Sequence, residues 1–385
     1  MNILIEGWRG INHSYSLVNQ WQILELSKFF NIYFKDIPFI SKDWNLKKNS
    51  SGLNENFNKI IQDIPNSNND IKSDIIYRIS SPLNFDNDFN SKLLFVFGTC
   101  EYKYLDKENY INGSPELLKY DENFFIHTPS KWSKEGFINI GFKDDQIIVI
   151  PHGVDKNTFD IISNEEKKII REKYKINDED FVLTNIGAMT KNKGVEVLIA
   201  AYGILKKKIK NLKLILKDQS NLYDIKTDYL FKKVRESELN TKYGIINDNM
   251  MKDIILISEN LTLAQLRKIY SITDCYVSPY LAEGFNLTPL EAAACGAQII
   301  VTKGGSTDDY FNSCMGYQID SKERKINNSY LLEPKIDSLI HILQEKVVNK
   351  NDTMKNKRSE FVHNNFSWEK VGNQLKTEFE KKINK

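Results

Sequence analysis

The chain has 385 residues, more than one hydrophobic core usually organises, and 41% of them are hydrophobic, so we expect two domains. Its 53 lysines and arginines nearly balance its 51 aspartates and glutamates, which argues against nucleic acid as the main partner but leaves a local basic patch open. The four cysteines lack paired spacing, no signal peptide is recognisable, and no run approaches the roughly 18 apolar residues of a membrane span, so we expect a cytoplasmic protein with reduced thiols.

In the first 150 residues, short apolar runs alternate with helical patterns. The runs that predict strands are Ile3–Glu6, Ile32–Phe34, Ile75–Tyr77, Leu93–Phe97, Phe124–His127 and Ile147–Ile150. A helix is expected after the first strand, because apolar residues recur at helical spacing from Leu17 to Leu24. Residues 37–73 are polar, and we interpret them as an irregular excursion with a short helix around Phe57–Ile64.

The second half of the chain repeats this alternation. Its predicted strands are Phe181–Ile186, Leu212–Leu216, Ile254–Ile257, Cys275–Val277 and Gln298–Val301. Strands that alternate with helices indicate parallel sheets covered on both faces, so each half is predicted to be a Rossmann-like α/β domain. The boundary is expected in the loop and charged helix between 151 and 180.

The stretch AEGFNLTPLEAAACG, from Ala282 to Gly296, carries the most chemical information. An apolar, aromatic run precedes it and an Ala-rich run follows Pro289, which together predict a strand, a tight loop and a helix. Amides at a helix N-terminus attract phosphate. The flanking carboxylates of Glu283 and Glu291 suit hydroxyl groups, so the combination favours a ligand that has both, such as a sugar nucleotide.

Four segments together resemble a known family, the retaining, nucleotide-sugar-dependent glycosyltransferases of family four, which have the GT-B fold. These segments are PHGVDKNTF at 151–159, NIGAMTKNKGVEVLIAAY at 185–202, CYVSPYLAEGFNLTPLEAAACGAQIIVTKGG at 275–305, and SWE at 367–369. The resemblance implies two Rossmann-like domains that face each other across a cleft. It also implies a hexosyltransferase-like enzyme that moves a sugar from a nucleotide-diphosphate sugar to a glycan, lipid or other hydroxyl acceptor, with retention of configuration, as in polysaccharide biosynthesis.

The resemblance also fixes where the domains should divide. Residues 1–157 and 366–385 are expected to form the N-terminal, acceptor-side domain, and residues 158–365 the nucleotide-sugar-binding domain. The last helix, from the N-cap Ser367, has an apolar stripe from Trp368 to Phe379 at spacings of three and four. We therefore expect it to leave the second domain and pack on the first.

By resemblance, the donor is held mainly by the second domain. Glu291 is expected to bind the ribose hydroxyls and Glu283 the donor sugar, while Lys193 neutralises the leaving diphosphate. The family usually has an Arg where this chain has Ala188, so a bidentate contact is replaced by a lone point charge. The expected donor-binding residues are Gly10, Lys193, Glu283, Gly284, Phe285, Asn286, Leu287, Thr288 and Glu291.

The acceptor side is expected in the first domain. Arg9 and His13, in the loop after the first strand, face a plausible site by resemblance, although the same loop also reads as a surface turn. Glu101 is a candidate for orienting the acceptor hydroxyl, with helix or turn capping as its alternative, and it joins Glu283 and Lys193 as an expected catalytic residue. His127 is interpreted as a hydrogen-bonded packing residue.

We expect no cofactor and no metal, with a UDP- or GDP-linked sugar as co-substrate and a glycan or lipid-linked acceptor. The basic segment 204–217 leaves open a peripheral contact with the inner membrane surface, although its second half reads as a buried strand. Two other functions remain open. One is a GT-B epimerase or phosphorylase, and the other is a non-catalytic sugar-nucleotide-binding protein, which Ala188 favours.

Overall fold

The computed structural model describes residues 1–385 except 41–50, 68–71, 87–89, 224–225, 349–351 and 385. The chain divides into two compact units. Unit 1 comprises residues 1–153, 327–330 and 365–385, and unit 2 comprises residues 154–326 and 331–364. The chain therefore enters unit 2 at Val154, contributes Asn327–Tyr330 to unit 1, and returns to unit 1 again at Asn365.

Unit 1 is built on a six-stranded parallel sheet with the strand order β2-β1-β3-β5-β7-β8. The strands are β1 Asn2–Gly7, β2 Asn31–Asp36, β3 Ile75–Ile79, β5 Leu93–Phe97, β7 Phe124–Thr128 and β8 Ile147–Val149. All six coincide with predicted runs. Three of them, β3, β5 and β7, are buried along their whole length, and such strands read as short, nearly continuous apolar segments. Two short strands, β4 Leu83–Asn84 and β6 Tyr110–Ile111, pair separately.

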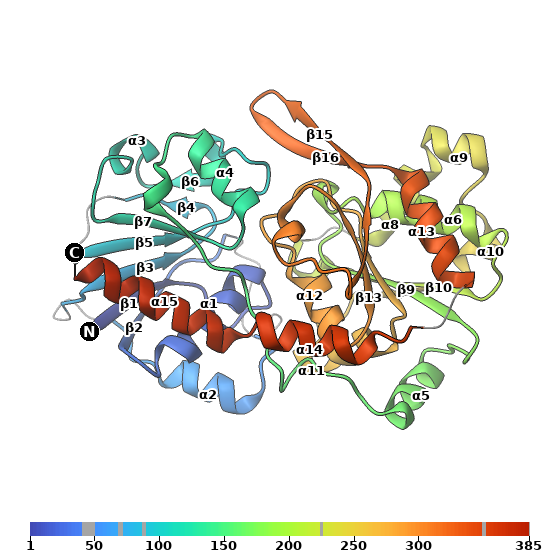
Figure 1. The fold of residues 1–385 in the computed structure, drawn as a ribbon, viewed down its shortest axis with the longest axis horizontal. Coiled ribbons are helices and arrows are strands. Elements are labelled where there is room, and N and C mark those ends of the chain that lie inside the picture. Colours follow the sequence, from blue (N-terminus) through green and yellow to red (C-terminus); the bar gives the residue numbers. More distant parts are fainter. Residues whose placement is uncertain (41–50, 68–71, 87–89, 224–225, 349–351, 385) are drawn as a thin grey trace. The chain divides into compact units, whose positions relative to one another are not determined.

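The helices of unit 1 come from both ends of the chain. They are α1 Ser14–Leu26, α2 Glu55–Asp63, α3 Pro115–Leu118, α4 Lys131–Asn139 and α15 Trp368–Ile383. The C-terminal helix α15 runs beside α1 (Figure 1), where Trp368 stacks on Trp21 with ring centroids 6.0 Å apart. Phe379, one turn before its end, meets Phe95 of β5 at 4.7 Å. The apolar stripe of this helix is thus buried in unit 1.

The polar excursion of unit 1 is described only in part. Its helix α2 overlaps the short helix predicted around Phe57–Ile64, and Asn54 caps its N-terminus by accepting from the Phe57 amide. Of the remainder, for which an irregular conformation was expected, residues 41–50 and 68–71 lie outside the described residues.

Unit 2 has a second six-stranded parallel sheet, with the order β11-β10-β9-β12-β13-β14. Its strands are β9 Phe181–Ile186, β10 Leu212–Lys217, β11 Ile254–Ile257, β12 Cys275–Ser278, β13 Gln298–Thr302 and β14 Gly316–Ile319. Five of these were predicted. The edge strand β14 was missed because its sequence, GYQI, lacks a continuous apolar run.

A two-stranded hairpin follows, formed by β15 Ser321–Ile326 and β16 Ser329–Pro334. Sequence patterns did not indicate it, because β15 is nearly all charged and exposed and so has no buried face to produce alternation.

Helices cover the sheet of unit 2 and complete its core. They are α5 Asn164–Lys173, α6 Val195–Lys206, α7 Ser220–Tyr223, α8 Thr227–Arg235, α9 Glu238–Tyr243, α10 Asp248–Met251, α11 Leu263–Ile272, α12 Leu287–Ala294, α13 Ile336–Val348 and α14 Lys355–Asn365. Short 3₁₀ turns occupy Lys191–Lys193 and Ser306–Asp309 in this unit, and Lys107–Asn109 and Asp144–Gln146 in unit 1. One face of the sheet packs its buried residues against α6, α8 and α13.

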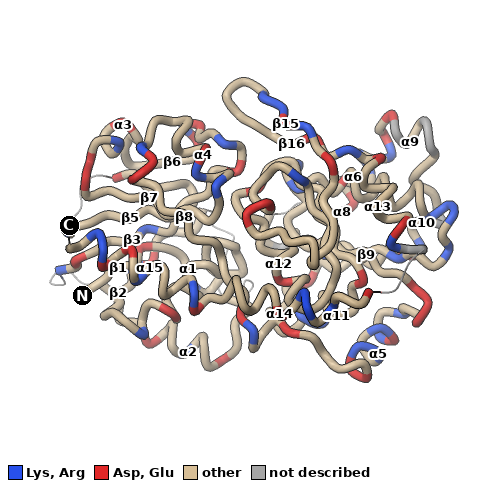
Figure 2. The backbone as a smooth tube through the Cα atoms, viewed as in Figure 1, with Lys and Arg blue, Asp and Glu red and all other residues tan. Residues whose placement is uncertain are grey.

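Basic and acidic residues are interspersed along both units (Figure 2), as the near-balance of charge suggested. Among the described residues, no helix is both long enough and apolar enough to span a membrane.

Candidate functional site

The loop between β12 and α12 is held in one conformation by its own side chains. Asn286, the residue before the helix, adopts the left-handed conformation with φ +68°, which Asn tolerates better than most residues. The side-chain amide of Asn286 donates to Ser278 Oγ at 2.9 Å, and Tyr310 Oη donates to the backbone carbonyl of Asn286 at 2.8 Å. The loop is therefore preorganised without a ligand.

The N-terminus of α12 lies at the carboxyl end of the sheet. The side chain of Asn286 bonds to Ser278 and does not cap the first turn of the helix. The amides of that turn, with the positive end of the helix dipole, provide a place for phosphate. This is the position that the sequence predicted for the diphosphate.

Glu291 lies one turn further along α12 and is only 8% exposed. Tyr270 Oη of α11 donates to its Oε2 at 2.8 Å. Burial raises the pKa of Glu291 from 4.5 to about 8, against the opposing effect of that hydrogen bond. At neutral pH this carboxyl is therefore mostly protonated, and it can both donate to and accept from a ligand hydroxyl.

Lys193 and Glu283 form an ion pair across two loops, with Nζ 2.5 Å from Oε1. Glu283 is 5% exposed, whereas the Lys193 side chain is about a quarter exposed. The pair brings together two residues that lie ninety positions apart in the sequence and that were both predicted to act on the donor. A ligand diphosphate at Lys193 would compete with this carboxylate.

The two loops are also joined through their backbones. The carbonyl of Asn192 accepts from the Leu281 amide at 2.7 Å, and its side chain donates to the Ala282 carbonyl at 3.2 Å. Gly194 has φ +63°, and a Cβ there would lie 2.0 Å from the Pro279 carbonyl oxygen. Only glycine fits this crossing, which explains the second glycine of the GAMTKNKG motif.

Gly187 and Ala188 begin the first of these loops and leave it open. Gly187 has φ +155°, and a Cβ there would meet nothing within 4 Å. Its amide donates to the carbonyl of Lys217, the last residue of the neighbouring strand β10. Lys217 is 2% exposed, its Nζ donates to the Asp218 carbonyl at 2.6 Å, and burial lowers its pKa to about 8.

Sequence reasoning did not single out Lys217. The signal was present, since a lysine ends an otherwise apolar strand beside the glycine of the loop. The rest of the basic segment is partly internal: Lys206 and Lys213 both pair with Asp253, at 2.7 and 2.9 Å.

Tyrosines that organise the site were also missed. Tyr276 Oη lies 2.7 Å from Thr288 Oγ1 and 2.9 Å from the Ile186 carbonyl oxygen, so it joins the end of β9 to the first turn of α12. Tyr310 and Tyr270 act similarly on Asn286 and Glu291. In sequence these residues look like ordinary core aromatics, because only the tertiary structure shows which group each hydroxyl bonds to.

In unit 1, the loop after β1 is tightly bonded to its own surroundings. Arg9 donates to both oxygens of Asp36, at 3.1 and 2.9 Å, and its guanidinium stacks on Phe34 at 4.4 Å. Gly10, with φ +80°, donates its amide to Gln20 Oε1. His13 caps α1 by accepting the Tyr15 amide at Nδ1, and burial lowers its pKa to about 4. The predicted acceptor-side residues thus have clear structural roles, and their acceptor role stays a prediction.

Glu101 follows β5 and is half-buried, with its carbonyl accepting from Trp132 Nε1 at 2.7 Å. The preceding Thr99 hydroxyl lies 3.0 Å from Tyr15 Oη, which also accepts the Thr99 amide. His127, by contrast, is enclosed between Tyr77 Oη at 2.6 Å and the Ile150 carbonyl at 3.1 Å. His127 is a hydrogen-bonded packing residue.

The structure gathers the predicted donor residues of unit 2 around the N-terminus of α12, and it places Arg9, Gly10, His13 and Glu101 after β1 and β5 of unit 1. Among the described residues, no group of three or more His, Cys, Asp or Glu is arranged to hold a metal ion.

Two parallel-sheet, Rossmann-like units define the GT-B class, and comparison with solved structures supports this fold over the whole chain. A glycosyltransferase from Rickettsia africae matches with a TM-score of 0.69 at 16% identity, covering 100% of this chain and 99% of that one. Anabaena HepE, crystallised with UDP and glucose, matches with a TM-score of 0.65 at 14% identity, covering 99% of this chain and 100% of that one.

Sequence comparison identifies the domain in unit 2. Residues 166–329 match the family described as Glycosyl transferases group 1. An uncharacterized glycosyltransferase of Methanocaldococcus jannaschii is 27% identical over 215 residues, which cover 54% of this chain and 49% of the relative. A D-inositol 3-phosphate glycosyltransferase of Pseudarthrobacter chlorophenolicus is 27% identical over 196 residues, covering 51% and 43%. The chain thus spans about half the length of these curated relatives or less, and its resemblance to the group 1 glycosyltransferases is confirmed.

Proposed function

We propose that this protein is a glycosyltransferase that takes its sugar from a nucleotide-diphosphate sugar held by unit 2. One arrangement carries the proposal: a buried carboxyl, a helix N-terminus and a lysine–carboxylate pair lie together at the carboxyl end of one sheet. Glu291 provides the ribose contact, the first turn of α12 the phosphate contact, and Glu283 the contact to the donor sugar. Ligands of open parallel sheets bind at this end of the strands.

The proposed chemistry is electrostatic stabilisation of the leaving group. As the bond between the sugar and the diphosphate breaks, negative charge grows on the phosphate oxygen. Lys193 then moves its interaction from Glu283 to that phosphate, while the amides of α12 share the charge. The configuration at the anomeric carbon is retained, and the departing phosphate oxygen takes the proton of the acceptor hydroxyl. Lysine and amides fill the role of a cation, so the reaction needs no metal.

The acceptor is proposed to be a glycan or a lipid-linked saccharide bound by unit 1, beside the loops that contain His13 and Glu101. The donor carries UDP or GDP. UDP is favoured as the first probe, because HepE, whose structure is similar, was crystallised with UDP and with UDP-glucose. The reaction is proposed to take place in the cytoplasm, where nucleotide sugars are made.

The test is a calorimetric titration with UDP, GDP and their hexose conjugates, followed by a hydrolysis assay without acceptor for each conjugate that binds. We expect one nucleotide sugar to bind and to be hydrolysed slowly. A matched pair of variants sharpens the result: Lys193→Ala should lose most of the hydrolysis, whereas Lys191→Ala, exposed on the same loop, should keep it. If no nucleotide sugar binds, the proposal is wrong.

A non-catalytic sugar-nucleotide-binding protein is the second candidate, and Ala188 is the observation that favours it. The loop at Gly187 and Ala188 carries no guanidinium, so Lys193 is the only cation of that loop that reaches Glu283 among the described residues. Tight binding with no hydrolysis and no transfer to any saccharide acceptor would decide for this candidate. Interconversion of two nucleotide sugars would indicate the epimerase instead.

A further inference from the structure

A cavity of about 470 Å³ lies in unit 2, away from the proposed donor site. It opens at the amino ends of three strands, beside Phe181 of β9, Asp274 before β12 and Gln298 of β13. The donor loops follow the carboxyl ends of the same strands. Strands of four to six residues rise about 3.3 Å for each residue, so the two regions lie roughly 13–20 Å apart.

Three of the four acidic residues in the wall of the cavity are engaged, and the fourth, Asp178, is exposed at its rim. Asp274 accepts the Val182 amide at 2.8 Å and faces Arg171 and Lys167 at 3.5 and 3.8 Å. Asp352 accepts two bonds from the buried guanidinium of Arg358, at 3.1 and 3.0 Å.

A third acid, Asp180, is satisfied in the same way. It accepts the Asn177 amide at 2.8 Å and lies 3.7 Å from Lys213. Lys213 and Arg358 stand outside the lining, so Asp180 and Asp352 are paired from outside the cavity, whereas Asp274 pairs with Lys167 and Arg171 of its wall.

Within the described ranges, some basic side chains of the wall, in contrast, lack an acidic partner or retain an unpaired N–H donor. Lys355 has no ion-pair or hydrogen-bond partner within the part of the chain that the structure describes. Arg171 is 94% buried, and its Nε finds no hydrogen-bond acceptor among the described residues. Lys168 also lines the cavity, and Lys346 lies 4.0 Å over the ring of Tyr317. Donors thus exceed acceptors, which is the pattern of a site for an anion.

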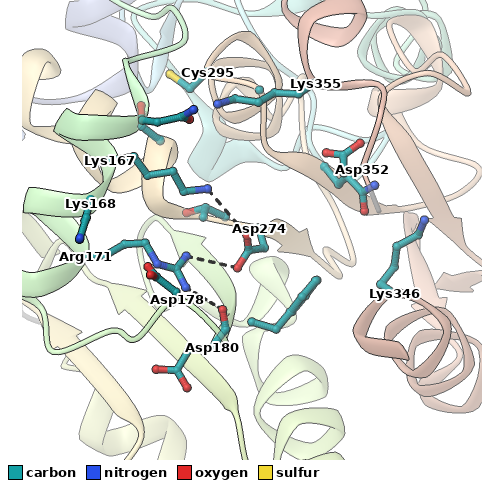
Figure 3. Close-up of a pocket in the computed structure, with 16 residues that line it drawn as sticks. Lys167, Lys168, Arg171, Asp178, Asp180, Asp274, Cys295, Lys346, Asp352 and Lys355 are labelled. Carbon is teal, nitrogen blue, oxygen red and sulfur yellow. Dashed lines mark hydrogen bonds and ion pairs between the residues drawn. The ribbon is translucent and has the colours of Figure 1, made fainter. Parts of the chain in front are cut away.

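Two lysines reach the cavity from different helices. Lys167 of α5 extends toward Asp274, and Lys355 of α14 lies across from it beside Cys295 (Figure 3). Burial, together with the positive charge of Lys167, lowers the pKa of Lys355. An anion between them would relieve this repulsion, whereas a cationic ligand would aggravate it.

We propose that this cavity binds a small phosphate-bearing anion, held by the ammonium groups of Lys355 and Lys167. A phosphate group offers several acceptor oxygens, which matches two ammonium groups that reach one cavity from different helices. The volume exceeds that of phosphate itself, so it also admits a phosphorylated metabolite. The site is separate from the donor site and makes the protein responsive to phosphate compounds.

The test is a calorimetric titration of the full chain with inorganic phosphate, at an ionic strength held constant with sodium chloride. The decisive variants are Lys355→Gln and Lys357→Gln, which remove the same charge two positions apart on α14. Lys357 is exposed and outside the cavity. We expect Lys355→Gln to weaken phosphate binding at least about tenfold and Lys357→Gln to leave it within about twofold, as loss of one charge-assisted contact implies.

Two further arms complete the experiment. Lys193→Ala should retain the phosphate binding that Lys355→Gln loses, because it alters only the donor loop. Equal weakening in Lys355→Gln and Lys357→Gln, loss of binding in Lys193→Ala alone, or no binding at all would each overturn the proposal. Glycerol 3-phosphate is titrated in parallel: if it binds more tightly than inorganic phosphate, the ligand is a phosphate monoester, and if more weakly, the free ion.

Discussion

Glu291→Gln should make the ligand-free protein more stable while weakening its hold on a nucleotide. Burial raises the pKa of Glu291 from 4.5 to about 8, so folding opposes ionisation of this carboxyl. The folded protein then binds a proton that the unfolded chain has released between pH 4.5 and 8. Stability contributed by this group is therefore fully present below pH 4.5 and is lost as the pH rises through about 8.

The size of the effect follows from the same values. Between the two pKa values, the free energy of unfolding falls by about 1.36 kcal/mol for each pH unit. At pH 7 the loss is therefore about 3 kcal/mol. Glutamine has the same shape, keeps an oxygen for the Tyr270 hydroxyl and carries no charge. A gain of this size should raise the unfolding temperature by roughly 6–12 °C for a unit of this length.

The assay is scanning calorimetry of both proteins from pH 4.5 to pH 9, with Glu172→Gln as the control because Glu172 is exposed on α5. The advantage of Glu291→Gln should be absent near pH 4.5, should grow up to pH 8 and should then level off. A difference that does not change with pH would refute the reasoning, and so would a variant less stable than the parent at pH 8.

Four further outcomes are expected. Lys193→Ala should lower turnover more than it weakens donor binding, because Lys193 leaves Glu283 to meet the charge that develops in the transition state. Steady-state kinetics beside a binding titration measures both effects. A change confined to binding would mean that Lys193 serves ground-state recognition only. Activity should survive EDTA, and loss that magnesium or manganese restores would contradict a metal-independent reaction. Unit 1 should lose stability as the pH falls from 6.5 toward 4. Burial lowers the pKa of His127 to about 4 and of His152 to about 3, so the unfolded chain takes up these protons at a higher pH than the folded chain does. A melting temperature of unit 1 that stays constant over this range would count against the prediction. Deletion of residues 366–385 should destabilise unit 1 although the cut follows unit 2 in sequence, and hydrogen exchange that rises only in unit 2 would defeat this expectation.

The predicted strands show what local sequence determines. Each buried parallel strand needs a short apolar run, so all six strands of the sheet of unit 1 and five of unit 2 could be predicted. Strands without an apolar run leave no such pattern, and β14 and the charged strand β15 with its partner β16 were therefore missed.

The candidate site divides in the same way. The Glu283–Glu291 motif and the glycines of the first loop were predictable, because a helix N-terminus and a tight loop impose residue types at fixed spacing. The pairing of Lys193 with Glu283, the anchoring of Asn286 by Tyr310 and the depressed pKa of Lys217 were not. They join residues distant in sequence, or depend on how deeply a group is buried.

The sequence by itself determined the two-fold repetition of parallel-sheet units, the motif that should meet a phosphate, and the return of the last helix to the first unit. Only the tertiary structure decided which charges are satisfied: Arg9 is bound to Asp36, and Asp352 to Arg358, while Lys355 still faces a cavity. The reason is physical. Apolar periodicity is a local property of the chain, but whether a charged group has a partner depends on which distant segments the fold brings against it.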